Sequence, residues 1–146
     1  MKILTPLLLA LALTGCAQPF LLPRDENGEV GAQRRRWESQ NLDDYRFHFA
    51  RTCFCVPMGV VVVEVRDDRV VAVKDAQTGN PVTGPQAQGI PTIEQLFDYI
   101  ADAASEGTYL DVKYHSSLGY PTEAEIGTLA NDAGVRYSVG NVQRVR

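Results

Sequence analysis

The chain has 146 residues and is acidic, with 14 basic side chains against 18 acidic ones and a net charge of −4. This length fits one globular domain with one core. The longest basic run is Arg34 to Arg36, so neither the charge nor its distribution predicts binding to nucleic acid.

The N-terminal segment has the pattern of a secretory signal, in which Lys2 precedes an apolar run from Ile3 to Leu13. That run ends in Leu13-Thr14-Gly15-Cys16, with a cysteine where ordinary signal peptides carry a small residue. A transmembrane anchor is the alternative, but a span needs roughly 20 apolar residues and this run is shorter. The segment therefore resembles a bacterial lipoprotein signal. That resemblance implies that residues 1–15 are removed and that Cys16 carries the acyl chains, palmitate among them.

The lipoprotein interpretation predicts three parts of the chain. Residues 1–15 are the signal peptide, residues 16–31 are the lipidated cysteine and a flexible tether rich in proline, glycine and charge, and residues 32–146 form one domain. We expect the protein to be anchored to a bacterial membrane in the cell envelope, with its domain outside the cytoplasm. Two or more acyl chains hold a protein stably on a bilayer, so the domain itself need not touch the membrane.

The first half of the domain reads as a helix followed by strands. Residues 32–41 predict a short helix, and the alternation of apolar and polar residues over 45–49 predicts a strand that continues toward Cys53. The β-branched runs 60–66 and 70–74 then predict a hairpin, with Asp67-Asp68 as its tight turn.

The second half repeats this order after a long loop at 75–91 that is rich in glycine and proline. Thr92 and Gln95 have the spacing of a capping box at the start of an amphipathic helix, and Gly107 is placed to end it. Three further strands are predicted at 109–115, 122–126 and 135–142. The order α-βββ-α-βββ predicts an α+β fold, an antiparallel sheet of about six strands with helices on one face.

Cys53-Phe54-Cys55 is the one pattern that suggests thiol chemistry. In a regular strand both thiols point to the same face, with Cα atoms roughly 6.6 Å apart, near the upper limit for a disulfide. Three interpretations stay open: a disulfide that fixes the end of the strand, a redox-active pair and a metal-binding pair. We favour the disulfide, since the expected compartment is oxidising and two thiolates alone do not complete a metal site.

Other residues suggest no active site. His48 is expected on the strand face opposite the two cysteines, and His115 belongs to a different strand. The chain contains no nucleophile elbow, phosphate-binding loop, zinc-helix motif or dinucleotide fingerprint. We therefore expect no catalytic residues, no metal and no cofactor.

Several motifs together are similar to an uncharacterised bacterial lipoprotein family that carries a domain of unknown function. They occur in one order over residues 32–143: Trp37, Tyr45-Arg46-Phe47, Cys53-Phe54-Cys55, the hairpin at 60–73, Val112-Lys113-Tyr114 and Gly119-Tyr120-Pro121-Thr122. The chain departs from the family pattern at His115 and Gly127, where members often have aspartate. The resemblance implies no known reaction.

These observations predict a non-catalytic binding or interaction module at the cell envelope, whose ligand is an envelope protein or a small molecule. A thiol-disulfide redox protein that uses Cys53 and Cys55 is the first alternative, and an envelope metal-binding protein is the second.

Overall fold

The computed structural model describes residues 26–56 and 58–145. Its elements in chain order are α1 (Glu26–Glu38), β1 (Tyr45–Cys53), β2 (Val61–Arg66), β3 (Arg69–Asp75), the 3₁₀ helix η1 (Gly84–Gln86), α2 (Ile93–Ser105), β4 (Leu110–Tyr114), β5 (Pro121–Ile126), the 3₁₀ helix η2 (Leu129–Asn131) and β6 (Val135–Arg144).

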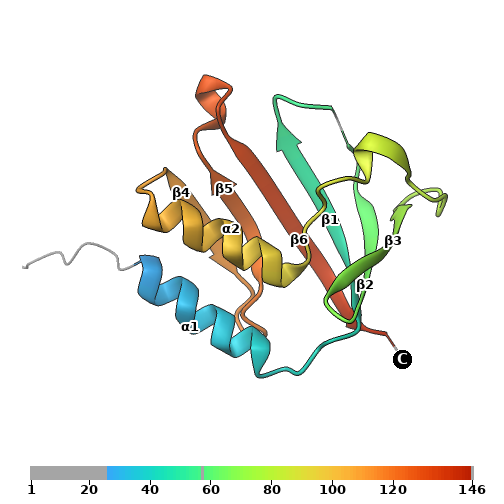
Figure 1. Ribbon diagram of the computed structural model, residues 1–146, viewed down its shortest axis with the longest axis horizontal. Helices are drawn as coiled ribbons and strands as arrows, with labels where there is room; N and C mark the ends of the chain where they lie inside the picture. The colour runs from blue at the N-terminus through green and yellow to red at the C-terminus, as the bar shows by residue number, and fades with distance from the viewer. Residues whose placement is uncertain (1–25, 57, 146) are drawn as a thin grey trace, which may run out of the picture.

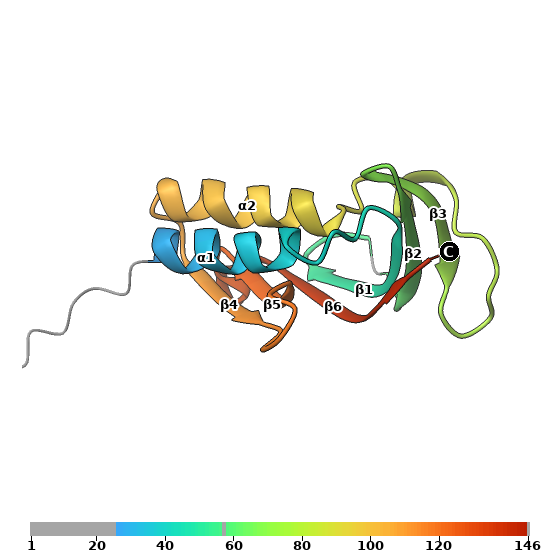
Figure 2. The same cartoon turned by 90° about the horizontal axis from the view of Figure 1, so that it is seen from below.

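The six strands form one antiparallel sheet in the order β3-β2-β1-β6-β5-β4. Both α-helices cover the same face of this sheet and lie side by side (Figures 1 and 2). The predicted α+β class and the order α-βββ-α-βββ are confirmed. Each half of the chain contributes a helix and a three-stranded meander, and the halves join where β1 pairs with β6.

The β2–β3 hairpin forms as the sequence predicts. Asp67 and Asp68 take φ values of 45° and 59°, so both central residues of the two-residue turn are left-handed. Aspartate tolerates this conformation better than most residues, and the resulting type of turn matches the twist of the strands.

The capping box at the start of α2 is also present. The hydroxyl of Thr92 accepts a hydrogen bond from the backbone N–H of Gln95, whose side chain accepts one from the N–H of Thr92. The helix ends before Gly107, which has the left-handed φ of 68°. These local signals fix both ends of α2.

The first helix differs from the prediction at both ends, since α1 begins at Glu26 and ends at Glu38. Residues 26–31, expected as part of the tether, are therefore helical. Val30 and Trp37 are buried and supply the physical reason, because two anchors seven positions apart lie on one helix face. Arg34 of α1 also pairs with Asp98 of α2 at 2.6 Å.

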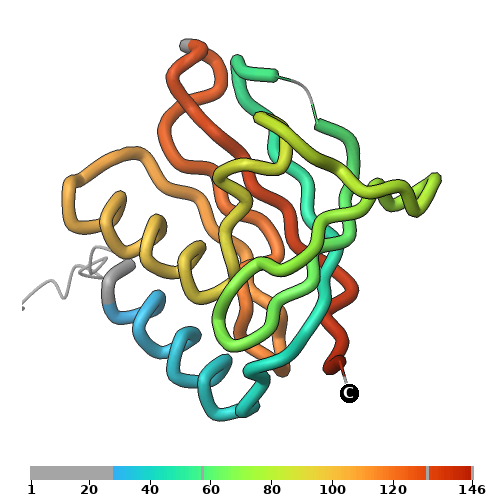
Figure 3. Tube along the Cα trace, turned by 45° about the vertical axis from the view of Figure 1, so that its right-hand side comes forward, coloured from blue at the N-terminus to red at the C-terminus, as the bar shows by residue number. Residues whose placement is uncertain are grey.

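The long connection from β3 to α2 returns along the edge of the sheet (Figure 3). Pro81 forms an isolated antiparallel bridge with Lys74, and the N–H of Val82 donates to the carbonyl of Val73 at 2.9 Å. The segment predicted as a loop thus covers the C-terminal end of the outer edge of β3.

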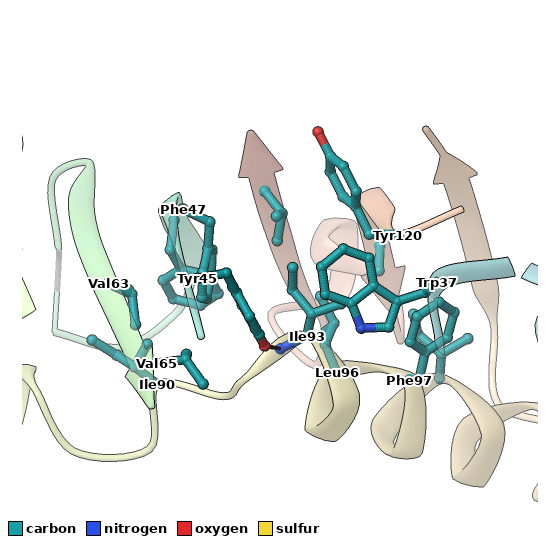
Figure 4. Packing of buried hydrophobic residues seen from close by; sticks show 14 of the residues in the cluster. Trp37, Tyr45, Phe47, Val63, Val65, Ile90, Ile93, Leu96, Phe97 and Tyr120 are labelled. Carbon is teal, nitrogen blue, oxygen red and sulfur yellow. Dashed lines mark hydrogen bonds between the residues drawn. The ribbon is translucent and has the colours of Figure 1, made fainter. Parts of the chain in front are cut away.

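The core lies between the sheet and the two helices. Alternate side chains of β1 and β2 point toward α2. The side of α2 that faces the sheet carries one continuous row of buried residues. Figure 4 shows part of this packing, whose fully buried members include Tyr45, Phe47, Phe49, Val61, Val63, Val65, Ile93, Leu96, Phe97 and Ile100. The opposite face of the sheet has no such cover among the described elements (Figure 2).

Candidate interaction surface

The connection between β1 and β2, residues 54–60, exposes apolar side chains at one end of the sheet. The exposed fractions are 83% for Phe54, 56% for Val56 and 47% for Val60. Large apolar side chains clustered at the surface mark interaction sites more often than scattered ones do. We refer to residues 54–56 and 58–60 as the apolar loop.

The two cysteines lie at the base of the apolar loop. Cys53 is the last residue of β1 and pairs with Val135, after which the chain bends, so that the Cα atoms of Cys53 and Cys55 are 5.2 Å apart instead of the roughly 6.6 Å of a regular strand. The two sulfur atoms lie at disulfide distance. Cys53 is half-buried and Cys55 is exposed.

Regular strand alternation predicts that Phe54, between the two cysteines, packs onto the opposite face of the sheet, and the structure differs from this prediction. Its side chain projects into solvent, because β1 ends at Cys53 and the strand alternation ends with it. The bend between the cysteines thus presents an aromatic ring at the surface.

The uncovered face of the sheet next to this loop is hollowed. On this face His48 of β1 stands between Val62 of β2 and Gly140 of β6 in the strand register. One hollow of about 270 Å³ is lined by Arg46, His48, Val62, Asn141 and Gln143. A second hollow of about 290 Å³ is lined by His48, Phe49, Ala50, Val60, Ser138, Val139, Gly140 and Asn141. The two share His48 and Asn141, and the second reaches the apolar loop at Val60.

Polar contacts fix the walls of the first hollow. The guanidinium of Arg46 donates two hydrogen bonds to Oε1 of Gln143, at 3.1 and 3.3 Å. The amide nitrogen of Asn141 lies 3.2 Å from Nδ1 of His48. Asn141 has a φ of 51° and sits where the β1–β6 register shifts, so a bulge in β6 aims this side chain across the sheet.

The same face is charged at its other end, over β4, β5 and β6. Arg136 bonds to Glu125, and Lys113 pairs with Glu123 at 3.4 Å. The hydrogen bond from Arg136 lowers the pKa of Glu125 below its ordinary value. These charges extend from β4 to β6, where Arg136 lies opposite Thr52 of β1.

The histidines have local partners. Nδ1 of His115 accepts from the backbone N–H of Leu118 at 3.2 Å, and the ring stacks on Tyr120 with centroids 4.8 Å apart. His48 lies on the open face, opposite the core side to which Phe47 and Phe49 point. Among residues 26–56 and 58–145, no three histidine, cysteine or acidic side chains gather to hold a metal ion.

Sequence reasoning did not identify Asn141 or Glu94 as structurally informative. The Gly140-Asn141 dipeptide inside a predicted strand is a signal for a bulge and could have indicated the role of Asn141. No local pattern indicates the role of Glu94, because its hydrogen-bond partners come from α1 and β1.

The comparisons with known proteins identify a family. The chain matches the model of DUF6174, a family of unknown function, over residues 29–144 and belongs to that family. The comparisons with curated proteins and with solved structures gave no significant match. No helix within the described ranges is long and apolar enough to cross a membrane.

The motifs that carried the family resemblance are mainly structural. Trp37 packs edge-on against Tyr45 and Tyr120, with ring centroids 5.3 and 5.9 Å apart. Gly119 has a φ of 83°, and a Cβ there would lie 2.7 Å from the carbonyl oxygen of Gln33. The Gly119-Tyr120-Pro121 segment therefore packs closely against α1 and holds it on the sheet.

The two positions at which the resemblance implies a departure, His115 and Gly127, lie at turns. His115 accepts backbone hydrogen bonds in the turn that precedes Gly119. Gly127 has a φ of 71°, and a Cβ there would lie 2.7 Å from the carbonyl oxygen of Ala133. A side chain at Gly127 would require the neighbouring loop to shift.

Proposed function

We propose that this chain is an envelope lipoprotein whose domain is a non-catalytic binding module for another envelope protein. The Leu13–Cys16 pattern supports the anchor, although Cys16 itself lies outside the described residues. Residues 17–25 separate Cys16 from α1 and reach at most about 30 Å when fully extended. A domain on such an anchor meets its partner close to the membrane surface.

The anchor is tested with Cys16→Ser in the full chain. Wild-type protein should fractionate with membranes and show an intact mass that includes acyl chains, and the variant should do neither. Wild-type protein that is soluble and free of acyl mass would refute the lipoprotein assignment.

The exposed ring of Phe54 is the observation that carries the binding role. Val56 and Val60 of the same loop are also exposed, and Val60 lines the second hollow on the uncovered sheet face. Aromatic residues are enriched in the cores of protein interfaces, where burial of such a ring removes a large apolar area from water. A protein surface of matching apolar character suits this site better than a small polar ligand.

Photo-crosslinking in cells tests this role. A photoreactive residue at position 54 should give a discrete protein adduct, and one at the exposed Val71 of β3 should not. The partner identified from that adduct is then purified, and its Kd is measured for wild type, Phe54→Ser and Val71→Ser. We expect about a tenfold weaker Kd for Phe54→Ser alone; equal Kd values for all three proteins would exclude the apolar loop from binding.

Thiol-disulfide exchange is the second candidate, and the exposure of Cys55 favours it. An attacking thiolate of a partner dithiol could reach its sulfur, forming a mixed disulfide and releasing the thiolate of Cys53. The partner's second thiol would then resolve this bond, so that the pair is reduced and the partner oxidised. A measured potential near those of redox proteins supports exchange, and one below about −300 mV supports a structural bond.

A further inference from the structure

We propose that the protein forms a two-fold dimer in which β4 pairs antiparallel with β4 of a second copy, so that the two sheets become continuous. This surface lies at the sheet edge away from the apolar loop. The dimer is therefore independent of the binding role and can fail without affecting it.

The two edge strands of the sheet, β3 and β4, differ in how far other segments of the chain cover them. The C-terminal part of the outer edge of β3 is covered by its own following segment, through the Lys74–Pro81 bridge and the Val82–Val73 hydrogen bond. In the described part of the chain, no segment pairs with the outer edge of β4. An uncovered edge strand presents backbone groups that can pair with another strand.

The backbone pattern shows which residues face outward. The carbonyl of Tyr109 accepts from the N–H of Gly127 at 2.9 Å, and the carbonyl of Lys113 accepts from the hydroxyl of Thr122 at 3.1 Å. Odd-numbered residues of β4 thus direct their backbone groups toward β5. Because these directions alternate along a strand, the N–H and C=O of Leu110 and Val112 point away from the sheet.

The charge pattern of β4 is self-complementary in one register. With the two-fold axis at Val112, Asp111 of each copy lies opposite Lys113 of the other. These positions are non-hydrogen-bonded pairs, in which Cα atoms are about 4.5 Å apart and side chains are nearest. Within its own chain Asp111 lies opposite Glu125, a like charge, and interacts electrostatically with Arg136, but among the described residues no cation lies within 4.0 Å of its carboxylate. The second copy would place Lys113, which pairs with Glu123 in its own chain, directly opposite Asp111.

Neighbouring registers are disfavoured by the same charges. An axis at Asp111 sets two aspartates opposite each other, and an axis at Lys113 sets two lysines opposite each other. A shift to odd-with-even pairing would place the apolar residues of the two copies on different faces. Charged residues, lysine above all, often protect an edge strand from pairing, but here the two-residue offset of opposite charges permits one pairing.

The symmetry of this dimer suits a membrane-anchored chain. A two-fold axis perpendicular to the sheet keeps the helices of both copies on the same side. Figures 1 and 2 place the start of α1 at the β4 end of the molecule, so the first residues of both α1 helices would lie on one side of the dimer and near its centre. Two chains anchored in one bilayer could pair in this way, and the shared anchor would raise their effective concentration.

Site-specific crosslinking tests the register. Full-length chains with two different tags are co-expressed, one carrying Asp111→Cys and the other Lys113→Cys, and membranes are oxidised. The two-tag disulfide dimer should exceed by at least about fivefold the yields of Asp111→Cys with itself and of Lys113→Cys with itself. Val71→Cys on β3 reports random collision in the membrane. Mixed yields no higher than those of the like pairs or of Val71→Cys would overturn the proposal.

Charge reversal provides a second measurement on the purified full chain in detergent. Asp111→Lys and Lys113→Asp should each raise the dimer dissociation constant about tenfold. The double swap Asp111→Lys/Lys113→Asp should bring the dissociation constant most of the way back to the wild-type value. Circular dichroism of each variant verifies folding. A wild-type protein that stays monomeric through the accessible concentrations, or single variants that dimerise like wild type, would also overturn the proposal.

Discussion

The hydroxyl of Tyr45 donates a 2.6 Å hydrogen bond to Oε2 of Glu94 and accepts one of 3.0 Å from the backbone N–H of Ile93. The other carboxylate oxygen of Glu94 accepts from Nε1 of Trp37, also at 2.6 Å. One side chain at the start of α2 thereby joins β1, α1 and α2. Burial and the negative charge of Glu94 raise the pKa of Tyr45, so its hydroxyl remains a donor.

Tyr45→Phe should lower the free energy of unfolding by about 1–3 kcal/mol. The substitution keeps the ring but leaves a buried N–H without its acceptor and a carboxylate without its donor. Urea unfolding measures the loss, and Tyr109→Phe, at an exposed tyrosine, is the control. A Tyr45→Phe protein as stable as the control would show that this junction contributes little.

Leu96→Ala and Phe97→Ala should each cost about 2–5 kcal/mol. Both side chains are buried on the sheet-facing side of α2, and Phe97 stacks against Tyr114, so truncation removes apolar contacts and leaves a cavity. Asp102→Ala on the exposed side of the same helix is the matched control. Surface substitutions normally change the free energy of unfolding by no more than about 0.5 kcal/mol. Losses within that range of the control would therefore mean that α2 does not pack as described.

The local elements could be predicted because their signals are local. Thr92 and Gln95 define a capping box at fixed spacing, and Asp67-Asp68 lies between two β-branched runs. Each signal involves backbone and side chains within a few residues. The class of fold then followed from the order of the elements.

The start of α1 and the surface could not be predicted in this way. Residues 26–31 carry glycine and charge, and the burial of Val30 against the rest of the fold favours their helical conformation. The exposure of Phe54 depends on where β1 ends, and the hollow at His48 depends on the Asn141 bulge in a strand far along the chain. These features arise from tertiary contacts, which periodicity does not report.

The ion pair between Glu125 and Arg136 predicts a pH effect. Because Arg136 lowers the pKa of Glu125 in the folded state, this carboxylate adds stability above its unfolded pKa, and that contribution is lost as the pH falls through the lower folded value. Below about pH 4.5 the urea midpoint of wild type should therefore fall more steeply than that of Glu125→Gln. Glu106→Gln, at an exposed acid without an ion pair, should follow wild type. Parallel curves for wild type and Glu125→Gln would exclude this linkage.

The cysteine pair gives the last prediction. We expect Cys53 and Cys55 to be oxidised to each other in the mature protein, as mass spectrometry of a non-reduced digest can establish. Cys53→Ser/Cys55→Ser should lower the free energy of unfolding by only about 1–2 kcal/mol, since so small a loop removes little entropy from the unfolded chain. Wild type in reducing buffer is the control and should show a similar loss.

A digest with two free thiols would contradict the pairing. If the Ser variant instead lost much more stability than the reduced wild type, the packing of the half-buried Cys53 side chain, rather than the bond, would be the cause.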